Sequence, residues 1–113
     1  RNIVIEKENV MIKKAIRMNL YPGAKAEYQK RHDELWPEMR EMLKEHGALS
    51  YSIFLDSESN QLFGYLEIED EEKWNQVSTT AINQKWWTYM KDLMETNPDD
   101  SPVSFDLEPV FEL

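Results

Sequence analysis

Apolar and polar residues alternate over four stretches of the chain, which is the pattern of β-strands that bury one face. The four stretches are residues 12–20, 49–55, 62–69 and 103–107. Turn-forming residues bound them: Pro22 and Gly23 follow the first, a polar run separates the second from the third, and Pro109 limits the fourth. The pattern therefore predicts four strands, the second and third joined as a hairpin.

The segment between the first two strands has helical spacing, and a proline interrupts it. Proline has no amide proton and its ring clashes with the carbonyl four residues earlier, so Pro37 predicts a break between about Asp33 and Trp36. A second helical part then restarts with Pro37 in the first turn, where a missing donor is tolerated. Gly47 supplies the left-handed conformation that ends it.

Another helical segment follows the third strand. Asp70 and the two glutamates after it suit a helix start, so a short helix carrying Trp74 is predicted there. Spacings of three and four residues then predict a further helix, whose inward stripe comprises Ile82, Trp86, Met90 and Leu93. Trp87 is rotated by about 100 degrees from Trp86, so we expect the second indole to serve another surface.

The element order is strand, helix, strand, strand, helix, strand. It predicts an α+β fold, the ferredoxin-like split βαβ sandwich of the dimeric α/β barrel type, in which an antiparallel sheet carries helices on one face. The bare face then needs a ligand or a second copy of the chain. Because Val110, Phe111 and Leu113 make the C-terminal tail apolar, we expect a homodimer in which the tail acts as an arm.

Length and the polar break at 6–9 suggest how the chain is divided. With 113 residues it has the length of one domain. Met11 begins the first strand-like run, so we interpret residues 1–10 as a leader, either upstream sequence or an addition, and residues 11–113 as a single domain. We find no secretory signal, which favours a cytoplasmic location.

Charge and composition narrow the function classes. A net charge of −9 and a pI near 4.7 disfavour binding to nucleic acid and to anionic membranes. The longest apolar runs fall far below the roughly 20 residues that span a bilayer. Without cysteine, disulfides, thiolate catalysis and cysteine-based metal sites are excluded.

His32 is the first candidate for chemistry. It stands four residues after Tyr28, on the same apolar helix face and just before the break at Pro37, where polar groups would border an apolar surface. A packed histidine that binds a backbone carbonyl is the simpler alternative. His32 and His46 lie fourteen positions apart, and HExxH, glycine-rich phosphate loops and GxSxG are absent. We therefore expect no metal site, and neither nucleotide binding nor serine hydrolysis through the usual motifs.

The tyrosines and tryptophans suggest a ligand. Tyr28 and Tyr51 lie on surfaces that could converge, and Trp86 and Trp87 form a pair. Indoles stack on the apolar faces of sugar rings while phenols and imidazole bind hydroxyls, so this set suits a neutral carbohydrate. Alternatively, one indole belongs to the core and the other to a dimer interface.

Several separated motifs resemble the L-rhamnose mutarotase family. They are residues 28–32, 35–38, 46–48, 86–87, 89–90, 97–99 and 101–103. The likeness runs from about Met11 to the C terminus, and it implies a ferredoxin-like fold that dimerises through its sheets. Carried over residue by residue, it makes His32 the catalytic acid and makes four residues the sugar contacts: Tyr28, Tyr51, Trp86 and Trp87.

The activity implied by this resemblance is the interconversion of sugar anomers. The ring oxygen is protonated as the anomeric hydroxyl loses its proton, the hemiacetal opens, the aldehyde turns and the ring recloses. Only protons move, so imidazole suffices and a cofactor is not needed. Two rivals are a dimeric ferredoxin-like haem or quinone monooxygenase and a non-catalytic sugar-binding domain.

Overall fold

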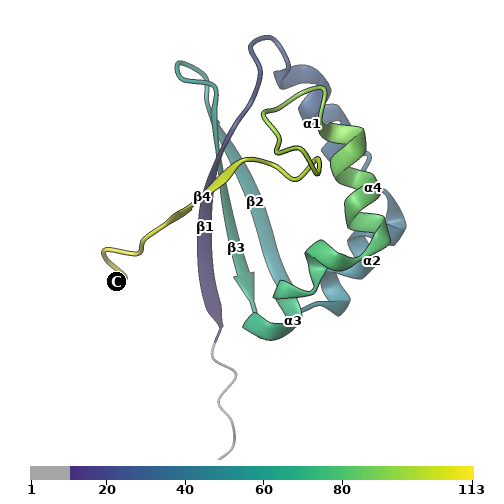
Figure 1. The fold of residues 1–113 in the computed structure, drawn as a ribbon. Coiled ribbons are helices and arrows are strands. Elements are labelled where there is room, and N and C mark those ends of the chain that lie inside the picture. Colours follow the sequence, from purple (N-terminus) through teal and green to yellow (C-terminus); the bar gives the residue numbers. More distant parts are fainter. Residues whose placement is uncertain (1–10) are drawn as a thin grey trace, which may run out of the picture.

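The computed structural model describes residues 11–113, and the leader expected over 1–10 lies outside the described residues. Its centre is a four-stranded antiparallel sheet with the strand order β2-β3-β1-β4 (Figure 1). The strands are β1 (Ile12–Asn19), β2 (Ala48–Asp56), β3 (Gln61–Ile68) and β4 (Ser104–Leu107). This is the strand order of the ferredoxin-like sandwich, and the predicted fold class is confirmed.

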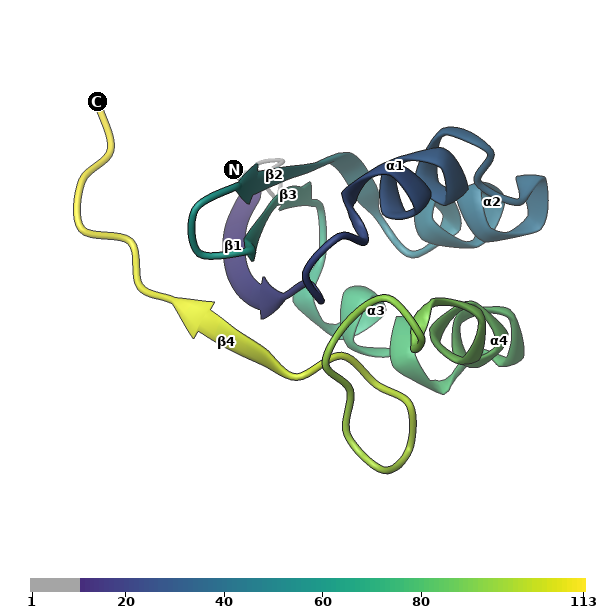
Figure 2. The ribbon, with the colours of Figure 1, turned by 90° about the horizontal axis from the view of Figure 1, so that it is seen from above.

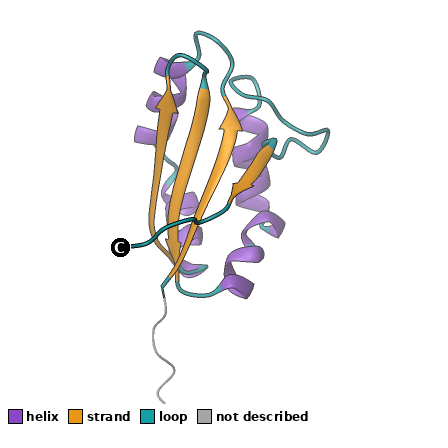
Figure 3. Cartoon of the chain, turned by 90° about the vertical axis from the view of Figure 1, so that its left-hand side faces the viewer, coloured by secondary structure: helices purple, strands orange, loops and turns teal. Residues whose placement is uncertain are grey.

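The helices all cover one face of this sheet (Figure 2). They are α1 (Lys25–Asp33), α2 (Pro37–Glu45), α3 (Glu71–Asn75), the 3-10 turn η1 (Val77–Thr79) and α4 (Ala81–Met90). The opposite face, seen in Figure 3, carries no helix formed by residues 11–113. Among residues 11–113, none of the helices has the length and apolarity needed to cross a bilayer.

The predicted break in the first helical segment is confirmed. α1 ends at Asp33 and α2 begins at Pro37, so the missing amide proton of proline falls where a helix start leaves its amides unpaired. Gly47 follows α2 with φ of +91°, in the left-handed region that favours glycine. Two short helices thus replace one long one, and the end of α1 lies over the sheet.

The second helical segment is fixed by its caps. The Asp70 carboxylate accepts a bond of 3.0 Å from the amide of Lys73 at the start of α3. The Thr80 hydroxyl accepts one of 3.3 Å from the amide of Asn83 at the start of α4. These bonds satisfy amides that a helix start leaves free. The cap at Thr80 therefore fixes where α4 begins, and with it the direction in which the aromatic residues of α4 project.

Strand β3 separates the two faces of the sheet. Its inward residues Leu62, Gly64, Leu66 and Ile68 are all buried, in strict alternation with half-buried neighbours. A side chain at Gly64 would come within 3.1 Å of Ile16 Cγ1 and 3.5 Å of Tyr51 Cε1. The glycine therefore leaves the room that these two side chains occupy.

Candidate active site

A cavity lies between the inner face of the sheet and the helices. Its volume is about 1170 Å³, ample for a small molecule. All five residues predicted for the site line it: Tyr28, His32, Tyr51, Trp86 and Trp87. They come from α1, β2 and α4, so the fold brings together side chains that lie up to 59 positions apart in the chain.

His32 stands in the last turn of α1, with its ring held by the backbone. Its Nδ1 lies 2.9 Å from the carbonyl oxygen of Tyr28. A carbonyl can only accept a hydrogen bond, so Nδ1 carries the proton and, in the neutral ring, Nε2 carries the lone pair. The contact with a backbone carbonyl is the one expected of a packed histidine, yet His32 also lines the cavity.

Aromatic rings surround this imidazole. The Tyr28 ring lies 4.3 Å from it, centroid to centroid, and the Trp86 ring meets it edge-on at 5.3 Å. Removal from water lowers the pKa of His32 below 6.5, while the Tyr28 carbonyl and the charge of Asp33 oppose that shift. Around neutral pH the ring is therefore uncharged and can accept a proton at Nε2.

The two tyrosines are neutral hydrogen-bonding groups. Burial raises the pKa of Tyr28 well above its usual range and raises the pKa of Tyr51 to about 12. Tyr51 is 39% exposed as a whole residue, but its pKa reflects the desolvation of the hydroxyl end alone. Both phenols keep their protons near pH 7, so they can donate to a ligand but are poor bases.

Trp86 and Trp87 both line the cavity, but they differ in how deeply they are buried. Trp86 is 7% exposed and belongs to the core, where the Trp36 ring meets it edge-on at 5.1 Å. Trp87 is half-buried and packs against that core. Because both line the cavity, the other surface expected for Trp87 is the cavity wall.

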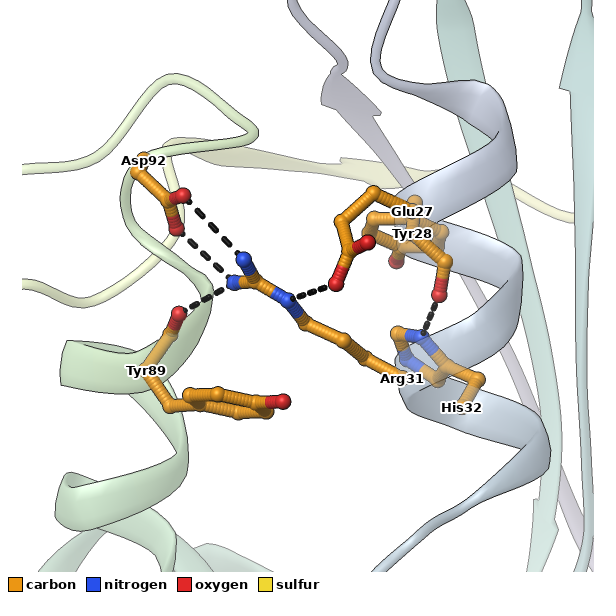
Figure 4. A network of polar contacts seen from close by, with 6 residues as sticks. All are labelled: Glu27, Tyr28, Arg31, His32, Tyr89 and Asp92. Atoms are coloured by element: carbon orange, nitrogen blue, oxygen red, sulfur yellow. Dashed lines mark hydrogen bonds and ion pairs between the residues drawn. The ribbon is translucent and has the colours of Figure 1, made fainter.

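Arg31 ties α1 to α4 behind this wall, and it is not among the residues predicted for the site. Its Nη1 lies 2.6 Å from the Tyr89 carbonyl oxygen, and its two terminal nitrogens contact the Asp92 carboxylate at 2.8 and 3.2 Å (Figure 4). Its Nε donates to Glu27 at 2.8 Å. Glu27 and Arg31 are four apart, which was readable from sequence. The contact from α1 to Asp92, which lies 61 positions away and just after α4, was not.

Asn83 is a second residue that sequence reasoning passed over. It is buried at 4% exposure and lines the cavity. Within residues 11–113, acidic residues and histidines nowhere form a group of three that could hold a metal ion. The lining also carries three further amides and five charged residues, none of them buried: Gln29, Asn75, Asn97, Lys25, Asp33, Arg40, Lys44 and Asp100. The buried polar and aromatic part of the lining presents imidazole, phenols, indoles and the Asn83 amide, a set suited to a hydroxylated ring.

Comparison with known proteins reveals one family. The family model described as L-rhamnose mutarotase matches residues 13–113. An L-rhamnose mutarotase from Enterococcus faecalis is 65% identical over 91% of this chain and all of its own length. The crystal structure of one from Formosa agariphila matches with a TM-score of 0.83 at 42% identity, covering 90% of this chain and 98% of that one.

More distant structures share the fold alone. A Bordetella bronchiseptica structure described as an antibiotic biosynthesis monooxygenase superposes with a TM-score of 0.66 at 14% identity, covering 89% of this chain and 98% of that one. At such low identity the likeness extends to the ferredoxin-like architecture and carries no argument about activity.

Proposed function

The chain belongs to the L-rhamnose mutarotase family, and from this premise we propose that it is an isomerase that interconverts the α and β anomers of L-rhamnopyranose. The reaction moves only protons, and the groups on the cavity lining suffice for it. The observation that carries the proposal is the position of His32: an uncharged imidazole, its Nδ1 fixed by a carbonyl, inside a cavity walled by two indoles.

We assign His32 the transfer of the reacting protons. As the catalytic acid it protonates the ring oxygen, but its lowered pKa means that Nε2 must first gain that proton. The anomeric hydroxyl can supply it, since that oxygen and the ring oxygen are bonded to the same carbon. Nε2 then returns the proton to the ring oxygen, the C–O bond of the hemiacetal breaks, and the reverse sequence recloses the ring on either face.

The remaining residues bind and orient the sugar in this proposal. Trp86 and Trp87 offer flat apolar surfaces to the ring, and Tyr28 and Tyr51 offer hydroxyls that stay protonated. An aromatic lining also suits a sugar that carries a methyl group in place of a terminal hydroxymethyl. We expect neither a metal nor another cofactor to take part.

The decisive experiment is the anomer-exchange rate of L-rhamnose, measured by saturation-transfer NMR with and without the protein. We expect the protein to accelerate anomer exchange at a protein concentration far below that of the sugar. Calorimetric binding of L-rhamnose with exchange at the background rate would instead identify a sugar-binding domain. A Soret band on adding haem would support the monooxygenase alternative.

We also propose that residues 11–113 form one domain and that two copies pair through their bare sheet faces. Support comes from Phe54 and Phe105, which are 65% and 45% exposed on strands of that sheet, and from the exposed apolar tail. Analytical ultracentrifugation tests the pairing. The cytoplasmic location remains a prediction, which cell fractionation would test.

A further inference from the structure

Asn83 is the one polar residue in the buried class among residues 11–113. It belongs to the first turn of α4 and stands three and four positions before Trp86 and Trp87, so the three side chains project from neighbouring parts of the same helix surface. Its main-chain amide is already used, because it donates to the Thr80 hydroxyl. What the side chain does is a separate question.

The Asn83 carboxamide makes no hydrogen bond to any residue that the structure describes, although only 4% of the residue is exposed. Fully occluded side-chain nitrogen or oxygen atoms without a partner do not occur among residues 11–113. The amide atoms must therefore keep an opening, and the cavity that Asn83 lines provides it. The partner of this amide therefore comes from within the cavity. A ligand that fills the cavity without bonding to the amide would leave a buried polar group unpaired, which costs about 1–3 kcal/mol.

We propose that Asn83 is a further substrate-binding residue, whose carboxamide hydrogen-bonds ring hydroxyls and thereby selects among sugars. This inference rests on the proposed function and extends it to specificity. A carboxamide donates and accepts at once, so it can bind neighbouring hydroxyls of a pyranose. Lying beside both indoles, it fixes how the ring is turned on their faces, which flat stacking alone leaves open.

Such an amide discriminates by leaving a polar group unpaired. A sugar with a hydroxyl at the contacted carbon pairs with it, whereas an analogue that lacks this hydroxyl returns Asn83 to its unpartnered state. Each lost hydrogen bond of this kind corresponds to about a tenfold loss in kcat/KM. Asn83 thus distinguishes sugars by the positions of their hydroxyls.

The test compares wild type and Asn83→Leu on L-rhamnose and on its 2-deoxy, 3-deoxy and 4-deoxy analogues, by anomer-exchange rates. We expect Asn83→Leu to lower kcat/KM for L-rhamnose by about 10- to 100-fold. The gap between the two proteins should shrink to within about twofold on the analogue that lacks the contacted hydroxyl. An equal gap on every sugar, or none, overturns the assignment.

Two controls separate binding from structure. Gln84→Leu changes the next residue of α4, which is exposed and absent from the cavity lining, and it should leave every rate unchanged. Asn83→Leu should leave the melting temperature of the sugar-free protein equal or higher, because leucine replaces an amide with no protein partner. A lower melting temperature together with a uniform loss of activity would reveal a structural role and overturn the proposal.

The same experiment separates this inference from the proposed function. If wild type fails to accelerate exchange of L-rhamnose, the proposed function fails, and the role of Asn83 fails with it. If wild type is active and the gap is uniform across the analogues, the assignment of Asn83 alone is wrong.

Discussion

The two faces of the sheet differ in almost every physical respect although the same strands build them. The inner face buries Leu62, Leu66 and Ile68 and carries the cavity with its rings. The outer face exposes large apolar groups such as Phe54 and Phe105. Alternation along a strand sends neighbouring residues to opposite faces, so one element can serve chemistry on one side and assembly on the other.

The electrostatics of the two faces differ in the same way. On the inner face, burial moves the pKa of His32 downward from 6.5, toward the uncharged form. On the outer face, hydrogen bonds from Ser50 and Tyr65 hold the pKa of Glu67 below 4.5, toward the charged form. Desolvation dominates in one place and hydrogen bonding in the other.

Removing the His32 imidazole should cause the largest loss of activity on the inner face. We expect His32→Ala to lower anomer exchange by about 10² to 10⁴, the usual contribution of general acid-base catalysis. His46→Ala is a matched control, because its Nδ1 contacts the Met42 carbonyl at 2.7 Å in the same geometry, away from the cavity lining. Equal rates for the two variants would refute the role of His32.

A charge on the outer face should separate the copies and spare the chemistry. Phe105→Asp places a carboxylate in the proposed interface, and we expect the dissociation constant of the proposed dimer to rise roughly 30-fold or more. Activity per chain should stay within about twofold of wild type, since Phe105 is absent from the cavity lining. Sedimentation velocity measures the first quantity and NMR exchange the second.

Ser57→Asp is the control for that experiment, because it adds the same charge at the exposed turn between β2 and β3. It should leave the dimer intact. Dissociation by both variants, or by neither, would contradict the assignment of the outer face to pairing.

The pH dependence should distinguish the faces without any mutation. The pKa of His32 is 6.5 in the unfolded chain and lower in the folded protein, so the ring stays neutral above pH 6.5. We expect kcat/KM to be flat there and to fall about tenfold per unit once pH drops below the folded pKa. The folding stability that this residue contributes is lost as the pH falls from 6.5 to the folded pKa, because over that interval the unfolded chain binds the extra proton.

The dissociation constant of the proposed dimer should stay the same between roughly pH 5 and 7, since Glu67 stays charged above its lowered pKa. Exchange rates and sedimentation coefficients measured across one pH series give both quantities. An activity limb centred above pH 6.5 would contradict the environment assigned to His32.

The smallest expected effect concerns the brace between α1 and α4. Arg31→Ala removes the bonds to Asp92 and to the Tyr89 carbonyl, and we expect a loss of about 1 kcal/mol in the free energy of unfolding. Since Arg31 adjoins His32, kcat should fall more than KM rises. Lys30→Ala, which removes the same charge one residue earlier, should change neither quantity. Urea denaturation and exchange kinetics measure them.

The fold and the break at Pro37 were predictable because their causes are local. Alternation, the proline and the left-handed Gly47 each act within a few residues. The five site residues came from motif resemblance, and the structure brings all of them to one cavity. The reach of Arg31 to Asp92 and the unpartnered amide of Asn83 depend on packing between distant segments, which no local pattern reports.

Gly64 gives this site an adjustable dimension. The space that a β-carbon would fill is taken by Ile16 and by the ring edge of Tyr51. The position of that phenol, and with it the width of the cavity there, therefore depends on residue 64 having no side chain. Directed evolution that enlarged residue 64 step by step would push the phenol inward. A substitution at residue 64 would in that way change the size of sugar that fits the cavity, while every residue that contacts the sugar is kept.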